Sequence, residues 1–436
     1  MNKKVEPRTL PGFVELLPKD QILFNEMKEK IKKSYEKFGF LPIDTPVIES
    51  SEVLLAKAGG ETEKQIYRFE KGDNDLVLRF DLTVPLAKYV TQYYNELSFP
   101  FRRYQIGKVY RGERPQKGRF REFYQCDIDI IGDGELSIIN DAEIPSIIYN
   151  TIKELGFEDF TISINNRKLL TGLFEELNLQ EKSVDIMRNI DKLEKIGKDN
   201  LIACLKDLEL NDNEIDMILK FIEIDGTTDE KINKLEELNF SNESFKQGLD
   251  EIKQVVKYVR NFGVPDENFK VDFTIARGLD YYTGTVYETF LNEYRELGSI
   301  CSGGRYDNLA EYYTDRKLPG VGISIGLTRL FDKLNELNAI KEYKKSIAKV
   351  LVVSMIEDKT KAIEIANILR KNEIETEVYL EDKKIKAKFK YADKLEIPYV
   401  IVIGEDEIQN NVVTLKNMQT GEQETLSLED VIKKIQ

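Results

Sequence analysis

The chain has 436 residues, 33% of them charged, a net charge of −14 and no histidine. Its length exceeds the size at which one hydrophobic core keeps growing, so we expect two or three domains; the missing imidazole excludes Ser-His-Asp and Cys-His hydrolases. With three distant cysteines, no apolar run long enough for a bilayer and no signal-peptide pattern, we predict a soluble cytoplasmic protein without disulfides or a membrane partner.

The first predicted elements are a helix, an extended piece and a strand. Apolar residues at three- and four-residue steps from Ile22 to Phe38 predict an amphipathic helix within residues 19–40 that ends at Gly39. A short extended segment follows at 41–50. Residues 75–80 alternate as a strand before a helical pattern begins around Thr83.

Residues 102–132 alternate with period two on both sides of "RPQKG", which predicts a long antiparallel hairpin. One face would be buried and carry Cys126 and Ile128. The other would face solvent and carry Phe123, Gln125, Asp127 and Asp129. Together with Arg111, Glu113, Arg119 and Arg121, this face suits a nucleotide, because arginines bind phosphate in pairs and Phe123 could stack on a base. An exposed hairpin with ordinary surface charges is the alternative.

Two changes in composition and residue spacing along the chain predict the domain organisation. Residues 171–260 have Leu, Ile, Glu and Lys at helical spacing, which predicts a helical insertion between residues 1–170 and 261–335 of one split domain. Residues 346–436 alternate strand and helix patterns, which predicts a small separate α/β domain. The expected fold class is therefore α+β.

The stretch "ARGLDYYTGTVYE" places Arg277 next to a glycine. Such an arginine can stabilise developing negative charge while the backbone stays out of the way. It could equally form an ion pair with Asp280, and Tyr281 and Tyr282 could be core aromatics.

Two glycine-containing stretches follow. In "CSGGRYDNL" the glycines allow a ligand to approach the backbone closely, although a tight turn is the commoner cause. In "GVGISIGLTRL" the glycine spacing is wrong for a dinucleotide loop, and no acidic residue follows at the required distance, so packing of a strand against a helix is expected.

The run "DKKIKAKFKYADK" mixes lysines with Phe389 and Tyr391, which suits RNA, although most lysine runs are solvated faces. At a net charge of −14, any nucleic-acid surface must be a local patch of this kind. No metal site is predicted from protein side chains; Mg²⁺ arriving with a phosphate substrate is the metal we expect.

Taken together, these stretches resemble the histidyl-tRNA synthetase family, which is a family of class II aminoacyl-tRNA synthetases. The hairpin is similar to the family's motif 2, "ARGLDYYTGTVYE" and "CSGGRYDNL" to its two histidine signatures, and "GVGISIGLTRL" to motif 3. "FGFLPIDTPVIES" and the preceding helix resemble motif 1, which implies a homodimer. The resemblance implies an antiparallel-sheet catalytic domain, a helical insertion and a C-terminal anticodon-binding domain.

The resemblance also implies roles for individual residues. ATP, with Mg²⁺, would be bound by Arg111, Glu113, Arg119, Phe123 and Arg329. Histidine would be bound by Asp81, Thr83, Gln125, Asp129, Arg277, Tyr281, Tyr282 and Tyr306. Arg111 and Arg277 would act on the α-phosphate as the catalytic pair. Arg114 and Gln116 would lie near the acceptor end of tRNA(His), and Lys384 and Lys388 would contact its anticodon side.

The implied reaction is attack of the histidine carboxylate on the α-phosphate of ATP, followed by transfer of histidine to the 3′-terminal ribose of tRNA. The residues agree with this, because a carboxylate and a tyrosine hydroxyl match the donor and the acceptor of a neutral imidazole. Two rivals stay open: the regulatory subunit of ATP phosphoribosyltransferase, which shares the catalytic fold, and a nucleotide-binding or RNA-binding scaffold without chemistry.

Overall fold

The computed structural model describes residues 4–56, 65–114, 118–275, 282–308, 310–339 and 344–436. Its contacts divide the chain into two compact units, Met1–Val14 with Met27–Leu337 and Glu15–Glu26 with Asn338–Gln436. The boundaries of the predicted domains, 1–170 with 261–335, 171–260 and 346–436, stay predictions.

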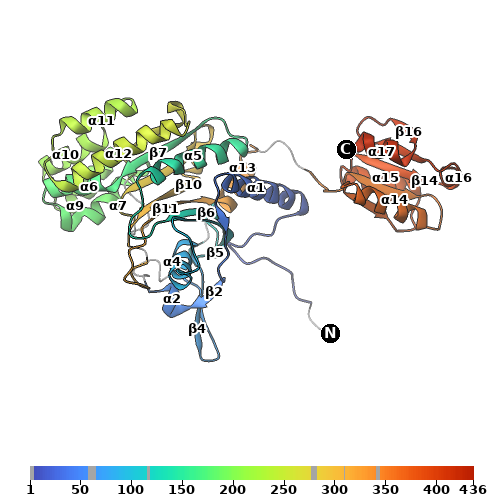
Figure 1. Cartoon of the computed structure of the whole chain (residues 1–436), viewed down its shortest axis with the longest axis horizontal. Coiled ribbons are helices and arrows are strands. Elements are labelled where there is room, and N and C mark those ends of the chain that lie inside the picture. Colours follow the sequence, from blue (N-terminus) through green and yellow to red (C-terminus); the bar gives the residue numbers. More distant parts are fainter. Residues whose placement is uncertain (1–3, 57–64, 115–117, 276–281, 309, 340–343) are drawn as a thin grey trace. The chain divides into compact units, whose positions relative to one another are not determined.

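An eight-stranded sheet lies at the centre of the first unit (Figure 1). Neighbouring strands are antiparallel, except that β1 is parallel to β5 and β7 is parallel to β8 at the two edges. In spatial order the strands are β1 (Leu41–Pro42), β5 (Phe101–Tyr110), β6 (Glu122–Ile131), β11 (Gly320–Gly326), β10 (Cys301–Tyr306), β9 (Thr285–Leu291), β7 (Phe160–Asn166) and β8 (Phe269–Val271).

Strands β5 and β6 form the predicted hairpin, and Arg103 lies directly opposite Asp129. Because side chains alternate along a strand, Cys126, Ile128 and Ile130 share one face of β6. Helices cover that face: the Tyr35 hydroxyl of α1 (Pro18–Lys37) donates to the Cys126 carbonyl at 3.0 Å. The opposite face, which carries Asp129, is left for the site.

Further helices pack on the sheet or beside it. Helix α5 (Ile139–Glu154) packs on β7, β10 and β11, and α13 (Leu327–Glu336) packs on β6. A second sheet has three strands in the order β2 (Ile48–Ser50), β4 (Asn74–Leu78) and β3 (Arg68–Lys71). In the sequence, helix α2 (Ser51–Leu54) follows β2, and helix α4 (Thr83–Gln92) follows β4. Short 3-10 turns, η2 (Asp266–Asn268) and η3 (Asn292–Leu297), flank β8 and β9.

The segment predicted to be helical consists of helices throughout. They are α6 (Arg167–Glu176), η1 (Gln180–Lys182), α7 (Ser183–Ile190), α8 (Leu193–Ile196), α9 (Lys198–Asp207), α10 (Asp212–Ile222), α11 (Thr228–Glu237) and α12 (Glu243–Asn261). The sequence sets two of their starts locally, because Asn211 with Glu214 and Thr227 with Glu230 form reciprocal capping boxes. Helix α12 then contacts α5, α6 and β7, which anchors the helices to the large sheet.

The second unit contains the predicted α/β arrangement. Its sheet has the order β13 (Thr376–Tyr379), β12 (Val350–Ser354), β14 (Tyr399–Ile403), β15 (Val413–Asn417) and β16 (Gln423–Leu426), and its helices are α14 (Thr360–Lys371), α15 (Ile385–Lys394), α16 (Glu405–Gln409) and α17 (Leu428–Ile435). Val350 and Val352 pack in one apolar cluster, whereas Leu351 and Val353 pack in another. Strand β12 is therefore buried on both faces, which explains its continuous apolar sequence.

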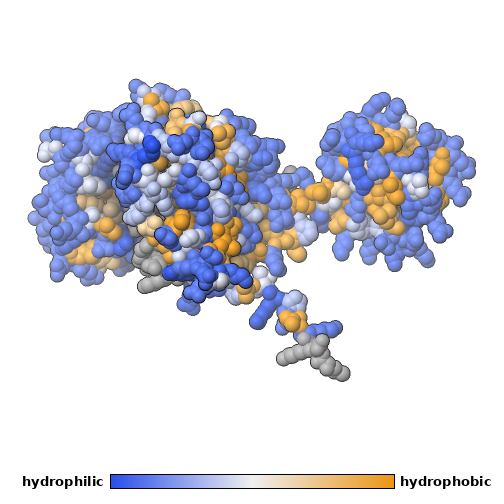
Figure 2. Space-filling view, turned by 60° about the horizontal axis from the view of Figure 1, so that its bottom comes forward, coloured by the Kyte–Doolittle hydropathy of each residue, from blue (hydrophilic) through white to orange (hydrophobic). Residues whose placement is uncertain are grey.

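The surface visible in Figure 2 is hydrophilic over most of its area, with hydrophobic residues in separate small groups. This agrees with a composition in which a third of the residues are charged. In the part of the chain that the structure describes, no helix is long and apolar enough to cross a membrane.

Candidate active site

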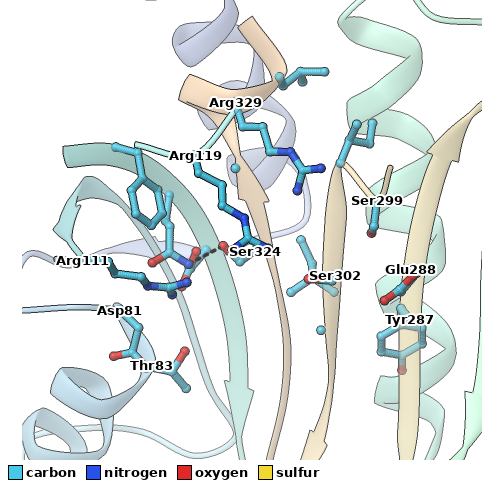
Figure 3. Close-up of a pocket in the computed structure, with 18 of the residues that line it drawn as sticks. Asp81, Thr83, Arg111, Arg119, Tyr287, Glu288, Ser299, Ser302, Ser324 and Arg329 are labelled. Carbon is cyan, nitrogen blue, oxygen red and sulfur yellow. Dashed lines mark hydrogen bonds between the residues drawn. The ribbon is translucent and has the colours of Figure 1, made fainter. Parts of the chain in front are cut away.

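A cavity of about 1020 Å³ lies over the polar face of the large sheet (Figure 3). Strands β6, β9, β10 and β11 supply its floor, and the turn before α4, the end of the hairpin and α13 supply its sides. It is lined by these predicted ligand residues: Asp81, Thr83, Arg111, Glu113, Arg119, Phe123, Gln125, Asp129, Tyr282, Tyr306 and Arg329. The fold thus brings together residues that are far apart in the sequence.

Cations and an aromatic ring gather at one end of the cavity. The Arg111 guanidinium lies 5.2 Å from the centre of the Phe123 ring. Arg119 Nη1 lies 3.4 Å from Glu113 Oε2, and Arg119 and Arg329 both extend into the cavity (Figure 3). Guanidinium groups around an aromatic face suit the phosphates and base of a nucleotide.

The other end of the cavity is built around a buried carboxylate. Asp129 Oδ1 accepts a hydrogen bond from the Tyr306 hydroxyl at 2.6 Å, and Asp129 Oδ2 lies 2.5 Å from Arg103 Nη2. Asp129 is 3% exposed, Tyr306 2% and Arg103 0%. Because its proton lies on Asp129, the Tyr306 oxygen can accept a hydrogen bond from a ligand N–H, such as that of an imidazole ring.

Three more polar residues line the cavity: Asp81, Thr83 and Gln125. Asp81 is buried in the turn before α4, and its Oδ1 accepts from the Val84 amide at 3.1 Å. Figure 3 shows Asp81 and Thr83 close together at the cavity wall. On the floor, Gln125 Nε2 donates to Ser324 Oγ at 2.8 Å, and this bond fixes the direction of the Gln125 amide.

Burial changes the acidity of the carboxylates that line the cavity. Desolvation raises the pKa of Asp81 to about 6 and that of Asp127 to about 7, while nearby Arg103 opposes both shifts. Desolvation also raises the pKa of Asp129, against the opposing effects of Arg103 and the Tyr306 hydrogen bond. Groups with displaced pKa values in a cavity are typical of functional sites.

Glycines in β11 and β10 make room for these side chains. A Cβ atom at Gly322 would lie 2.2 Å from Asp129 Oδ1, and one at Gly320 would lie 2.5 Å from the Tyr306 ring. Gly303 and Gly304 lie inside strand β10, so the tight turn considered for "CSGGRYDNL" is wrong; a Cβ atom at Gly303 would lie 2.1 Å from the Gly322 carbonyl, so this glycine allows close approach of the neighbouring strand. Close approach of a ligand stays a prediction.

The hairpin face that was expected to face solvent is largely covered. Asp127 is 2% exposed and Asp129 is 3% exposed, and Arg103 contacts both Asp129 and the Leu82 carbonyl, which brings the turn before α4 close to this part of β6. Arg121 is not among the residues that line the cavity; its backbone amide donates to the Gly12 carbonyl at 2.7 Å and its Nε donates to the Glu113 carbonyl at 3.1 Å. The alternation of residues predicted which side chains share a face of β6, but it did not predict that the rest of the fold would cover the polar face.

The predicted tRNA-binding residues lie in different environments. Arg114 and Lys384 are exposed. Lys388 is 4% exposed, and its ammonium donates to the Ser354 carbonyl at 2.7 Å, a position that does not support its predicted contact with RNA. It faces inward because α15 packs on β12, and helical spacing places Lys388 on that buried side. Arg277, Tyr281, Gln116 and the alternative partner Asp280 lie outside the described residues.

Sequence reasoning missed several residues of the site. Arg103 and Ser324 contact predicted ligand residues directly, and Arg188 and Lys192 from the helical segment line the cavity. For Arg103 a signal existed, because the hairpin register places it opposite Asp129. No local signal could have placed Arg188 or Lys192, since their position depends on how the helices pack.

Comparisons with known proteins agree with this architecture. A family model described as Histidyl-tRNA synthetase matches residues 12–330, and one described as Anticodon binding domain matches residues 349–436. A synthetase model followed by an anticodon-binding model defines an aminoacyl-tRNA synthetase. The predicted α+β fold class is confirmed.

Individual relatives narrow this class. The histidine–tRNA ligase of Clostridium tetani is 63% identical over 98% of this chain and 98% of its own, and that of Finegoldia magna is 52% identical over 99% and 100%. The crystal structure of histidyl-tRNA synthetase from Nostoc sp. PCC 7120 matches with a TM-score of 0.92 at 40% identity and covers 99% of both chains. The chain belongs to the histidyl-tRNA synthetase family.

Proposed function

We propose that this chain attaches histidine to its tRNA in two steps. The histidine carboxylate attacks the α-phosphate of ATP and releases pyrophosphate, and histidine then passes from the adenylate to the 3′-terminal ribose hydroxyl of tRNA. The observation that carries this proposal is one cavity with an arginine-rich end around Phe123 and a buried polar end around Asp129 and Tyr306.

The two ends of the cavity suggest a division of ligands. Phe123 would stack on adenine, and Glu113, Arg119 and Arg329 would hold the rest of the nucleotide. Arg111 would act on the α-phosphate between the two ends, with Arg277 as its predicted partner. Catalysis of this kind needs positioning and charge stabilisation rather than a covalent intermediate.

Histidine would occupy the buried end. Asp81 and Thr83 would bind its ammonium group, Gln125 its carboxylate side, and Asp129, Tyr282 and Tyr306 its imidazole, with Tyr281 as a further predicted contact. An amino acid without a polar ring would leave these buried groups unpaired. Such a loss is large enough to reject isosteric side chains without editing.

Mg²⁺, the homodimer and the cytoplasmic location are further parts of the proposal. Within the described residues no group of three or more acidic or cysteine side chains could hold a metal, so Mg²⁺ would arrive on the ATP phosphates, where Glu113 and Glu288 line the cavity. The exposed apolar residues Leu41 and Ile48, at 58% and 47%, support a subunit interface near β1 and β2. Sedimentation at micromolar concentration tests for the dimer.

The two rivals are weaker on the same evidence. A structure described as an ATP phosphoribosyltransferase regulatory subunit/histidyl-tRNA synthetase from Bacillus halodurans shares the fold, with a TM-score of 0.75 at 22% identity. The anticodon-binding match at 349–436 favours a tRNA-charging role over a purely regulatory one. A scaffold without chemistry does not explain why a nucleotide-type end and a buried polar end share one cavity.

Amino-acid-dependent pyrophosphate exchange, run separately with each of the twenty amino acids, tests the proposal. We expect exchange with histidine and none above background with the other nineteen. Absence of exchange with every amino acid would leave only a binding scaffold.

A further inference from the structure

Arg103 of strand β5 is fully buried below the histidine end of the cavity and does not line it. Its Nη2 lies 2.5 Å from Asp129 Oδ2 and donates to the Leu82 carbonyl at 3.2 Å. Leu82 lies between Asp81 and Thr83. One guanidinium therefore connects the wall that would bind the ammonium group with the floor that would bind the imidazole.

This contact also orients Tyr306. One carboxylate oxygen of Asp129 pairs with Arg103, and the other accepts a hydrogen bond from the Tyr306 hydroxyl at 2.6 Å. An ionised carboxylate can only accept, so the tyrosine proton must point toward Asp129. The Tyr306 oxygen then keeps its lone pairs for a ligand N–H, and this holds only while Asp129 stays ionised.

The surroundings of Arg103 make that ionised state costly. Burial raises the pKa of Asp81, Asp127 and Asp129, and Arg103 lowers the pKa of all three. The other charged or titratable groups that interact with this cluster of three carboxylates are Arg111 after β5, Tyr35 from α1, Cys126 from β6, Cys301 and Tyr306 from β10, and Tyr313. Tyr282, from the stretch before β9, acts on Tyr306. Within the described residues, Arg103 is the fully buried cation in contact with this cluster.

We propose that Arg103 is a positioning residue for histidine selection: without touching the substrate, it keeps Asp129 ionised, directs the Tyr306 hydroxyl, and holds the Leu82 backbone beside Asp81. This inference rests on the proposed function. If Arg103 had a purely structural role, its loss would weaken folding and reduce all activities together. If it is a positioning residue, its loss should raise the histidine KM much more than the ATP KM.

The test compares Arg103→Lys and Arg103→Met with the wild type by pyrophosphate exchange between pH 6 and pH 9. At pH 7 we expect the histidine KM of Arg103→Met to rise about 10- to 100-fold, as for loss of a charge-assisted contact, while the ATP KM changes less than about threefold. Because the carboxylates would then need higher pH to ionise, its histidine KM should fall toward pH 9. Arg103→Lys keeps the charge and should recover part of the loss, without that pH dependence.

Arg102→Met is the matched control. Arg102 is the preceding residue on β5, but it lies on the opposite face and pairs with Glu143 Oε1 at 2.8 Å. Its loss should lower the thermal midpoint and leave the ratio of the histidine and ATP KM values unchanged. If Arg103→Met does not fold, as judged by circular dichroism and ATP binding, Arg103→Lys decides by the same KM ratio.

An unchanged KM ratio in the folded Arg103 variants, or equal losses for histidine and ATP, would overturn the inference and leave the proposed function intact. A wild-type protein without histidine-dependent exchange would instead contradict the proposed function itself.

Discussion

Asp81 is the residue whose titration should be visible in substrate binding. Its buried carboxyl has a pKa of about 6, and an ammonium group binds to the ionised form. We expect the histidine KM to fall as the pH rises through about 6 and then to level off. Histidine's own imidazole titrates nearby, so Asp81→Asn is the control: it keeps the ligand's titration and loses the enzyme's. Its histidine KM should be higher than that of the wild type above about pH 6, and the two values should converge at lower pH. Identical profiles for the two proteins would contradict this assignment.

Burial of Asp127 should lower the stability of the folded protein at a pH where this carboxyl must ionise. Its pKa is raised from 3.8 to about 7, so the folded protein binds a proton that the unfolded chain has released. The contribution of Asp127 to the free energy of unfolding therefore falls as the pH rises from about 4 to about 7. Asp127→Asn should unfold at higher urea concentration than the wild type at pH 8, by on the order of a few kcal/mol, and the difference should shrink toward pH 4.

Arg277 carries the chemical step in the proposed mechanism. Its place beside the glycine of "ARGLDYY" predicts that Arg277→Ala loses most adenylate formation, about 100- to 1000-fold in pyrophosphate exchange, while ATP binding survives. Exchange and equilibrium ATP binding should be measured on the same preparation. Exchange near the wild-type rate would rule out this role.

At the scale of elements, the site depends on how closely the central strands approach one another. Strands β6, β11 and β10 lie side by side, and glycines in β11 and β10 leave the space that Asp129 and Tyr306 fill. These glycines therefore lie inside strands, where they shape the cavity, and do not form turns of the chain.

Gly322→Ala tests this packing. The new Cβ would lie 2.2 Å from Asp129 Oδ1 and 2.3 Å from the Ile128 carbonyl, and one of these groups is held by an ion pair and the other by the sheet. We expect a loss of about 1–3 kcal/mol, or a displaced Asp129 and a higher histidine KM. Gly326→Ala, at the end of the same strand, meets nothing within 4 Å and should change the thermal midpoint little.

At the scale of the whole molecule, the two units have separate cores and carry different parts of the proposed reaction. The large sheet carries the cavity, and residues 349–436 match an anticodon-binding domain. With a net charge of −14, binding of tRNA must depend on local cations.

Lys384 and Lys388 provide a matched pair for this point. Exposed Lys384, when changed to Ala, should weaken tRNA binding, reduce the salt slope by about 1 and leave histidine-dependent exchange unchanged. Buried Lys388, changed to Met, should alter the stability of the second unit and leave the salt slope unchanged. Filter binding at several salt concentrations and thermal unfolding separate the two effects. Equal salt slopes for all three proteins would argue against an RNA contact at Lys384.

Local pattern was enough for much of the architecture. Period-two alternation located the β5–β6 hairpin and its two faces, and helical spacing located the helices from α6 to α12. The motifs singled out Arg111, Phe123 and Asp129, which line the cavity. These features follow from neighbours in the chain, because periodicity and hydrogen-bond capping act over a few residues.

Tertiary structure alone decided what is buried. Alternation could not reveal that the polar face of β6 is enclosed, that Lys388 points inward, or that Arg188 reaches the cavity. The pKa of Asp127 likewise depends on desolvation by elements from distant parts of the chain. The physical reason is that burial and electrostatics are properties of three-dimensional surroundings, whereas sequence patterns report only a residue's neighbours along the backbone.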